Sequence, residues 1–209
     1  MTGTEKTSEN AKIALFIAII ILLSVTPLGY ISLGIINATT IQMPVIIGAV
    51  LFGWKKGAFL GGVFGITSLI KNTVQPNLTS FVFSPFVPVF GEESGSFFAI
   101  IISLLPRIMI GIVAAGVFAL LSKTKLSAAV KSAAAGFCGS LTNTVLVMGG
   151  IYLFFGESYS AAKEMAYETL LATVAATITG TGITEAVISA VACGAVCAAL
   201  IKYTKKTRT

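Results

Sequence analysis

The chain has 209 residues, of which 56% are apolar and only 11% are charged, and its mean hydropathy is +0.95. Soluble domains carry about 25% charged residues, and a globule this apolar could not cover its surface with polar groups. The composition excludes a soluble nucleic-acid-binding protein, a disordered chain and a disulfide scaffold. It predicts an integral membrane protein, in which the net charge of +6 reflects basic cytoplasmic loops.

Six apolar runs predict an all-α membrane protein with six transmembrane helices, because about 20 residues cross the hydrocarbon core. The second run is short, and we expect it to cross in a thinned or partly protein-enclosed setting. A polar cytoplasmic tail (residues 1–12) precedes the single membrane domain (residues 13–201), and a basic cytoplasmic tail (residues 202–209) follows it. The helices are expected in residues 13–31, 43–54, 57–69, 97–121, 128–155 and 170–201.

Basic residues decide between five spans and six. Lysines precede the first helix and follow the last, and others lie between the second and third and between the fourth and fifth runs. The acidic loop residues fall on the other side. By the positive-inside rule both termini are cytoplasmic, which requires an even number of spans.

The residues of common catalytic and metal sites are scarce. The chain has no His and no Asp, and it contains no Walker lysine loop. Its three cysteines, Cys138, Cys193 and Cys197, lie in apolar runs and are interpreted as packing residues. We therefore expect no enzyme, no catalytic residue, no metal and no cofactor.

Four polar residues within or beside the predicted spans are candidates for ligand binding. Arg107 follows Pro106 in the fourth helix, and Glu185 lies at similar depth in the sixth. Such groups are costly in a bilayer and face the bundle interior, so they either contact a ligand or pair with each other. Lys71 ends the third helix and either binds ligand or snorkels to the interface. Asn143 in the fifth helix makes either an interhelical hydrogen bond or a ligand contact.

Two predicted outward loops are unusual. The first, residues 31–42, offers polar groups that include Asn37 and Thr39. The second, residues 71–96, contains Asn72 and the run TSFVFSPFVPVF, in which aromatic rings alternate with prolines. This run favours a rigid apolar lid over a pocket, and an interfacial aromatic belt is the alternative. The lid residues are Phe81, Phe83 and Phe86.

Small residues recur at helical spacing in two of the predicted helices. Ala14 and Ala18 form an A-x-x-x-A pair, and Gly57, Gly61 and Gly65 form a G-x-x-x-G-x-x-x-G series. Such surfaces allow close helix approach. We interpret the glycines as packing within the chain, whereas the alanines form a groove for a partner helix or for the chain itself.

The stretch INATTIQMPVIIGAVLFGWKKGAFLGGVFGITSLIKNTVQPNLTSFVFSPF resembles the substrate-binding S components of energy-coupling factor (ECF) vitamin transporters. LLPRIMIGIVAAG and LTNTVLVMGGIYLFFG continue the likeness, which covers nearly the whole chain. Within the family the chain is most similar to the pantothenate-specific branch. Pyridoxine, hydroxymethylpyrimidine and riboflavin relatives have similar loops and remain alternatives, with a stand-alone secondary transporter as a more distant one.

The resemblance implies a multi-pass protein of a prokaryotic cell membrane that binds a small water-soluble vitamin in an outward-facing pocket. It also implies a transmembrane coupling subunit, docked at Ala14 and Ala18, and two ATP-binding subunits that supply the energy. The S component is expected to topple in the bilayer and deliver its vitamin. The expected substrate-binding residues are Asn37, Thr39, Lys71, Asn72, Phe81, Phe83, Phe86, Arg107, Asn143 and Glu185.

Overall fold

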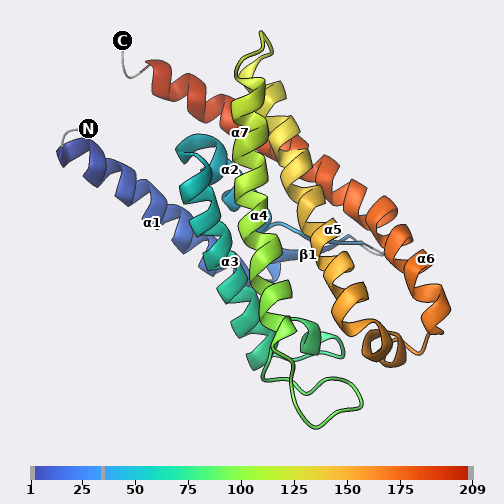
Figure 1. Ribbon diagram of the computed structural model, residues 1–209. Coiled ribbons are helices and arrows are strands. Elements are labelled where there is room, and N and C mark those ends of the chain that lie inside the picture. The colour runs from blue at the N-terminus through green and yellow to red at the C-terminus, as the bar shows by residue number, and fades with distance from the viewer. Residues whose placement is uncertain (1–2, 34–35, 207–209) are drawn as a thin grey trace.

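The computed structural model describes the backbone of residues 3–33 and 36–206 as a bundle of helices with one small hairpin at its side (Figure 1). Residues 167–206 form one continuous helical stretch, which a π-helical turn divides into two helices. The elements are α1 (Gly3–Val25), η1 (Pro27–Gly29), β1 (Tyr30–Leu33), β2 (Ile36–Thr39), α2 (Gln42–Phe52), α3 (Trp54–Val74), η2 (Ser80–Val82), α4 (Phe98–Leu121), α5 (Ala128–Ala162), α6 (Tyr167–Thr177), η3 (Ile178–Gly182) and α7 (Ile183–Lys206).

The helices suit a bilayer by length and composition. Four helical segments of the described chain are long and apolar enough to cross: Thr7–Val25, Phe98–Leu121, Ala128–Ala162 and Tyr167–Tyr203. The 21-residue α3 is about 31 Å long at 1.5 Å per residue, although lysines lower its hydropathy. The short α2 is almost wholly buried among the other helices, so protein rather than lipid surrounds it.

The glycine series packs α3 against α4. A Cβ atom on Gly61 would overlap the backbone carbonyl of Arg107, and one on Gly65 would lie 2.8 Å from the carbonyl oxygen of Ser103. The hydroxyl of Ser103 donates to the carbonyl of Gly65 at 3.2 Å. Only glycine allows the two backbones to approach this closely, and the predicted role of this series within the chain is confirmed.

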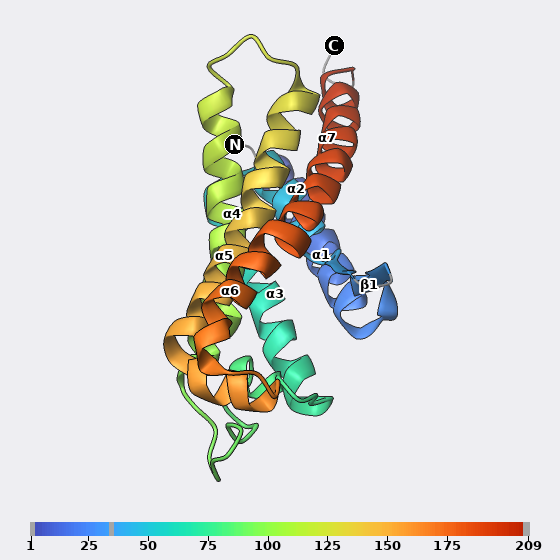
Figure 2. The same cartoon turned by 90° about the vertical axis from the view of Figure 1, so that its right-hand side faces the viewer.

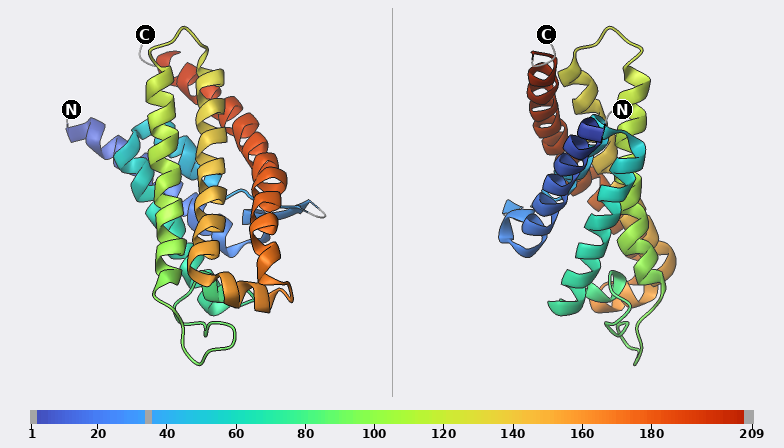
Figure 3. Two further views of the ribbon diagram at one scale, coloured as in Figure 1. Left: turned by 45° about the vertical axis from the view of Figure 1, so that its right-hand side comes forward. Right: turned by 90° about the vertical axis from the view of Figure 1, so that its left-hand side faces the viewer.

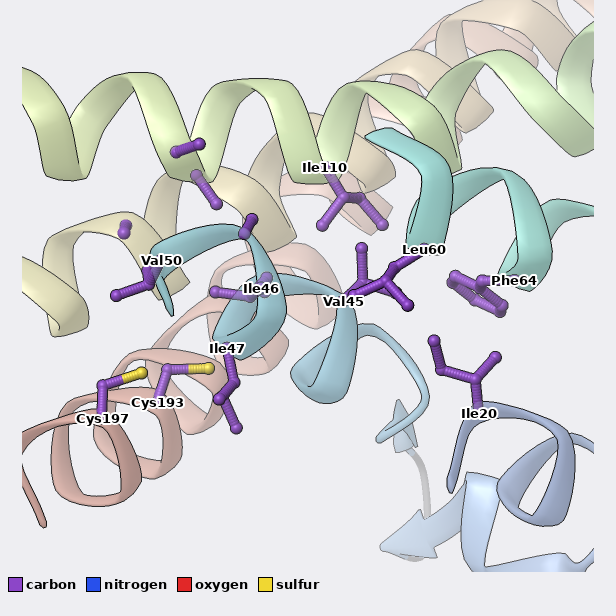
Figure 4. Close-up of a cluster of buried hydrophobic side chains, with 14 of the residues drawn as sticks. Ile20, Val45, Ile46, Ile47, Val50, Leu60, Phe64, Ile110, Cys193 and Cys197 are labelled. Carbon is purple, nitrogen blue, oxygen red and sulfur yellow. The ribbon is translucent and has the colours of Figure 1, made fainter. Parts of the chain in front are cut away.

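The main hydrophobic core surrounds α2 (Figure 4). Side chains of α1, α3, α4 and α7 converge on it, with Ile46 and Phe64 almost completely buried. Cys193 and Cys197 of α7 belong to this core, so their predicted role as packing residues is confirmed. A second core joins the loop before α4 to α4, α5 and α6.

Two features differ from the sequence-based expectation. The first outward loop forms an antiparallel hairpin, β1–β2, in which Tyr30 pairs with Thr39 and Leu33 with Ile36, so the fold is helical but not purely so. It projects from the side of the bundle (Figures 2 and 3). Residues 3–12 of the expected polar tail are the first turns of α1, because nothing in that segment breaks a helix.

Candidate functional site

Arg107 lies inside the bundle, directly after a proline within α4. Pro106 has no N–H, so the carbonyl of Ile102, four residues earlier, loses its helical partner. Arg107 Nη1 donates to that carbonyl oxygen at 2.7 Å. Only 7% of the Arg107 surface is exposed. The proline thus creates an acceptor that helps hold a buried guanidinium in place.

Two aromatic rings flank this guanidinium. Its carbon lies 5.6 Å from the ring centre of Phe64 in α3 and 5.1 Å from that of Phe83 in the loop before α4. A cation over an aromatic face is stabilised by the ring quadrupole. Of the predicted lid residues, Phe83 is therefore the one that the structure brings to Arg107.

Glu185 lies in the first turn of α7 and holds the hairpin. Its Oε1 accepts a hydrogen bond from the backbone N–H of Thr39 at 3.0 Å, and 8% of its surface is exposed. The contact links two predicted site residues that are 146 positions apart. The described contacts of Glu185 and Arg107 do not include each other, whereas Lys56 and Glu9 do form an ion pair.

The π-helical turn η3 ends at Gly182, three residues before Glu185. Single π-helical turns are frequent at functional sites because they re-aim the side chains around them. A Cβ atom on Gly182 would lie 2.8 Å from Cγ2 of Thr144, so this turn packs tightly on α5 beside Asn143. Asn143 is 8% exposed, and its Oδ1 has no hydrogen-bond partner among the described residues. A buried amide oxygen of this kind is ready to accept from a ligand.

A buried hydrogen-bond cluster joins three helices and was not predicted from the sequence. Nε2 of Gln42, the first residue of α2, donates to Ser140 Oγ of α5 at 2.9 Å and to Ser189 Oγ of α7 at 3.2 Å. Gln42 is 1% exposed, and neither serine is exposed. One signal was available, because Gln42 is an amide at the start of an apolar run that ends only at Trp54.

The long loop before α4 is fixed by polar contacts with the end of α3. Asn72 donates to the carbonyl of Ser68 at 2.8 Å, and its Oδ1 accepts from Ser80 Oγ at 2.8 Å. Both amide atoms of this predicted site residue thus hold local structure. Phe81 is buried against Phe155 of α5, with ring centres 5.8 Å apart. Phe86, by contrast, is 74% exposed.

The remaining predicted residues are Lys71, Asn37, Ala14 and Ala18. Lys71 lines a groove of about 640 Å³ between the ends of α1 and α3, whose walls are mostly apolar. The side chain of Asn37 lies outside the described part of the structure, although its backbone belongs to β2. Ala14 and Ala18 are both exposed on α1.

Three buried polar side chains make up the candidate site. A guanidinium, an amide and a carboxylate are buried in three different helices, and the hairpin and the long loop contribute Thr39 and Phe83. Within the described residues no group of three His, Cys, Asp or Glu side chains could hold a metal ion. These side chains could offer charge and hydrogen bonds to a small polar molecule.

A family model, "ECF transporter, substrate-specific component", matches residues 11–196. The chain belongs to this family. The S component is therefore part of a transporter and is not an enzyme, and its apolar helices make it a multi-pass membrane protein.

Two curated relatives share much of the S component's sequence. It is 40% identical over 155 residues to "Pantothenic acid transporter PanT" of Lactococcus lactis, covering 73% of this chain and 76% of that one. It is 30% identical over 158 residues to "Pantothenate transporter PanT" of Leuconostoc mesenteroides, covering 72% and 70%. The crystal structure of an S component for biotin from an ECF-type ABC transporter matches with a TM-score of 0.54 and 20% identity over 94% of each chain. That likeness supports the fold alone.

Proposed function

We propose that this S component binds pantothenate and delivers it to an ATP-driven ECF module. The two curated relatives named as pantothenate transporters support the choice of vitamin. The single structural observation that carries it is Arg107, a guanidinium buried inside the bundle between two aromatic rings. A desolvated carboxylate binds best opposite such a cation, and pantothenate has a carboxylate, whereas pyridoxine does not.

The rest of the vitamin carries donors. Pantothenate has two hydroxyls and an amide N–H, and the Asn143 Oδ1 atom is a buried acceptor that lacks a donor. Glu185 uses one carboxylate oxygen for Thr39 and has a second for a ligand hydroxyl. In this proposal Arg107 recognises the acidic end of the vitamin, and Asn143 and Glu185 recognise the donor end.

Two movable segments close the site in this proposal. The hairpin is held to α7 through the bond between Thr39 and Glu185, and Phe83 covers the guanidinium of Arg107. Exposed Phe86 takes no part in this closure. Phe81 anchors the loop by packing against Phe155 of α5.

We assign the lysine-bearing end of the bundle to the cytoplasm. The start of α1, the turn between α2 and α3, the loop between α4 and α5 and the end of α7 lie at that end (Figure 1). The opposite end carries the long loop and the connection from α5 to α6, and five glutamates lie in or beside these two segments: Glu92, Glu93, Glu157, Glu164 and Glu168. The positive-inside rule then places both termini in the cytoplasm and the candidate site toward the outer half.

The coupling subunit docks at Ala14 and Ala18 in this proposal. These alanines lie one helical turn apart, and both are exposed on a helix otherwise rich in Ile and Leu. Replacing both with Trp should abolish assembly with the coupling module and vitamin uptake, and vitamin binding by the isolated subunit should survive. Joint loss of binding and stability would show that the alanines pack within the chain.

A thermal-shift screen of the purified S component against the B vitamins tests the ligand. Pantothenate should raise the unfolding temperature with a concentration dependence, because a ligand that binds only the folded state stabilises it. Pyridoxine, hydroxymethylpyrimidine and riboflavin should not. A shift with one of those vitamins and none with pantothenate would refute the proposed ligand.

A further inference from the structure

The buried cluster of Gln42, Ser140 and Ser189 lies about one helical turn from the candidate site, on the side away from the long loop. Asn143 is three residues after Ser140 in α5, and Glu185 is four residues before Ser189 in α7. Residues three or four apart share a helix face. Because α5 and α7 run in opposite directions (Figure 1), both steps lead from the cluster toward the end of the bundle that carries the long loop.

The end of the hairpin and the start of α2 are bonded to α7 with the same spacing of about one helical turn. Thr39, which donates to Glu185, is three residues before Gln42, which donates to Ser189. The segment from Thr39 to Gln42 is therefore bonded to α7 at two points one helical turn apart. The inner point is fully buried, and the outer one is at the candidate site.

We propose that Gln42 is a positioning residue of the vitamin site. Its amide fixes α5 and α7 relative to each other, so that Asn143 and Glu185 face the same ligand and the hairpin starts from a fixed point. The proposal rests on the proposed function for its ligand and on the hydrogen bonds of Gln42 for its geometry.

Substitution of Gln42 by leucine separates positioning from stability. Leucine fills a similar volume, and each serine can donate instead to the carbonyl four residues earlier in its own helix. The unfolding temperature should therefore change little. Pantothenate affinity should fall about tenfold or more, which corresponds to about 1.4 kcal/mol. The matched control is Ser132→Ala, another fully buried serine of α5, which should leave the affinity unchanged.

A double-mutant cycle links the effect to the two serines. On a background of Ser140→Ala and Ser189→Ala, the Gln42→Leu change should weaken binding by less than about twofold, because its partners are already gone. A full tenfold loss on this background would show that Gln42 acts through other contacts, and the positioning role would be wrong.

A cross-link measures the positioning without any vitamin. Thr144 and Gly182 approach closely enough that cysteines at both positions should form a disulfide. In a background with the three native cysteines replaced by alanine, oxidation should be several-fold slower once Gln42 is leucine. An unchanged rate together with unchanged affinity would overturn the proposal. Failure of the unsubstituted protein to bind pantothenate would count against the proposed function alone, since the cross-linking rate would still test the positioning role of Gln42.

Discussion

The role of Arg107 leads to a prediction whose magnitude can be worked out from its contacts. Removing one partner of a buried, hydrogen-bonded charge pair costs about 2–5 kcal/mol of binding free energy, which is about 30-fold to about 4,000-fold in affinity. We expect a loss of this size for pantothenate when Arg107 is replaced by glutamine.

The same substitution also has a structural cost that must be removed. Arg107 donates to the carbonyl of Ile102, and an unsatisfied buried carbonyl costs about 1–3 kcal/mol of folding stability. Replacing Pro106 by alanine supplies an N–H that can bond to the same carbonyl. Arg107→Gln should therefore be measured in the Pro106→Ala background, where its effect on the unfolding temperature should be small.

Isothermal titration with two ligands completes the design. In the Pro106→Ala background, Arg107→Gln should weaken pantothenate binding by at least about 30-fold. The alcohol analogue of pantothenate, which has no carboxylate, should bind both proteins with similar affinity. Equal losses for the two ligands would mean that Arg107 supports the fold of the site, and unchanged pantothenate affinity would remove Arg107 from the site.

Three further predictions address packing and closure. Gly61→Ala should lower the free energy of unfolding by about 1–3 kcal/mol, because the added Cβ would overlap a backbone carbonyl of α4. Gly62→Ala should be neutral or stabilising in the same denaturation assay, because its Cβ would have only a distant neighbour. Equal effects of the two substitutions would contradict the close packing of α3 on α4. Phe83→Ala should speed pantothenate dissociation in a stopped-flow assay, and exposed Phe86→Ala should not; identical rates would count against closure by Phe83. Glu185→Ala should increase hydrogen exchange of the Thr39 amide, since its acceptor is lost, and unchanged protection would mean that this bond does not hold the hairpin.

The helical frame could be predicted because hydropathy alone controls it. Each of the six apolar runs contains a helix in the structure, although the first helix ends at Val25 and the expected residues 30–31 belong to β1. The glycine series and the buried cysteines have their predicted roles. The bounds differ most where polar residues continue a helix, as in residues 3–12 of α1. The hairpin was not predicted, because a short apolar segment with turn residues is equally compatible with the end of a helix and with a loop.

The candidate site was harder to predict, because its contacts join distant parts of the chain. The sequence identified Arg107, Asn143 and Glu185 as costly groups inside a membrane, but it could not show that Glu185 bonds to Thr39. It also could not identify Gln42, whose two partners are 98 and 147 residues away. Phe81, Phe83 and Phe86 lie in one short aromatic run, yet Phe81 is buried, Phe83 is half-buried and Phe86 is exposed. Tertiary packing alone decides which ring is covered.

The most direct test of the central claim is a titration of pantothenate into the purified S component without any partner subunit. The proposed function predicts saturable binding at one site per chain, with the alcohol analogue at least about 30-fold weaker because it cannot pair with Arg107. Equal binding of the two compounds, or no saturable binding of pantothenate where another B vitamin does bind, would contradict it.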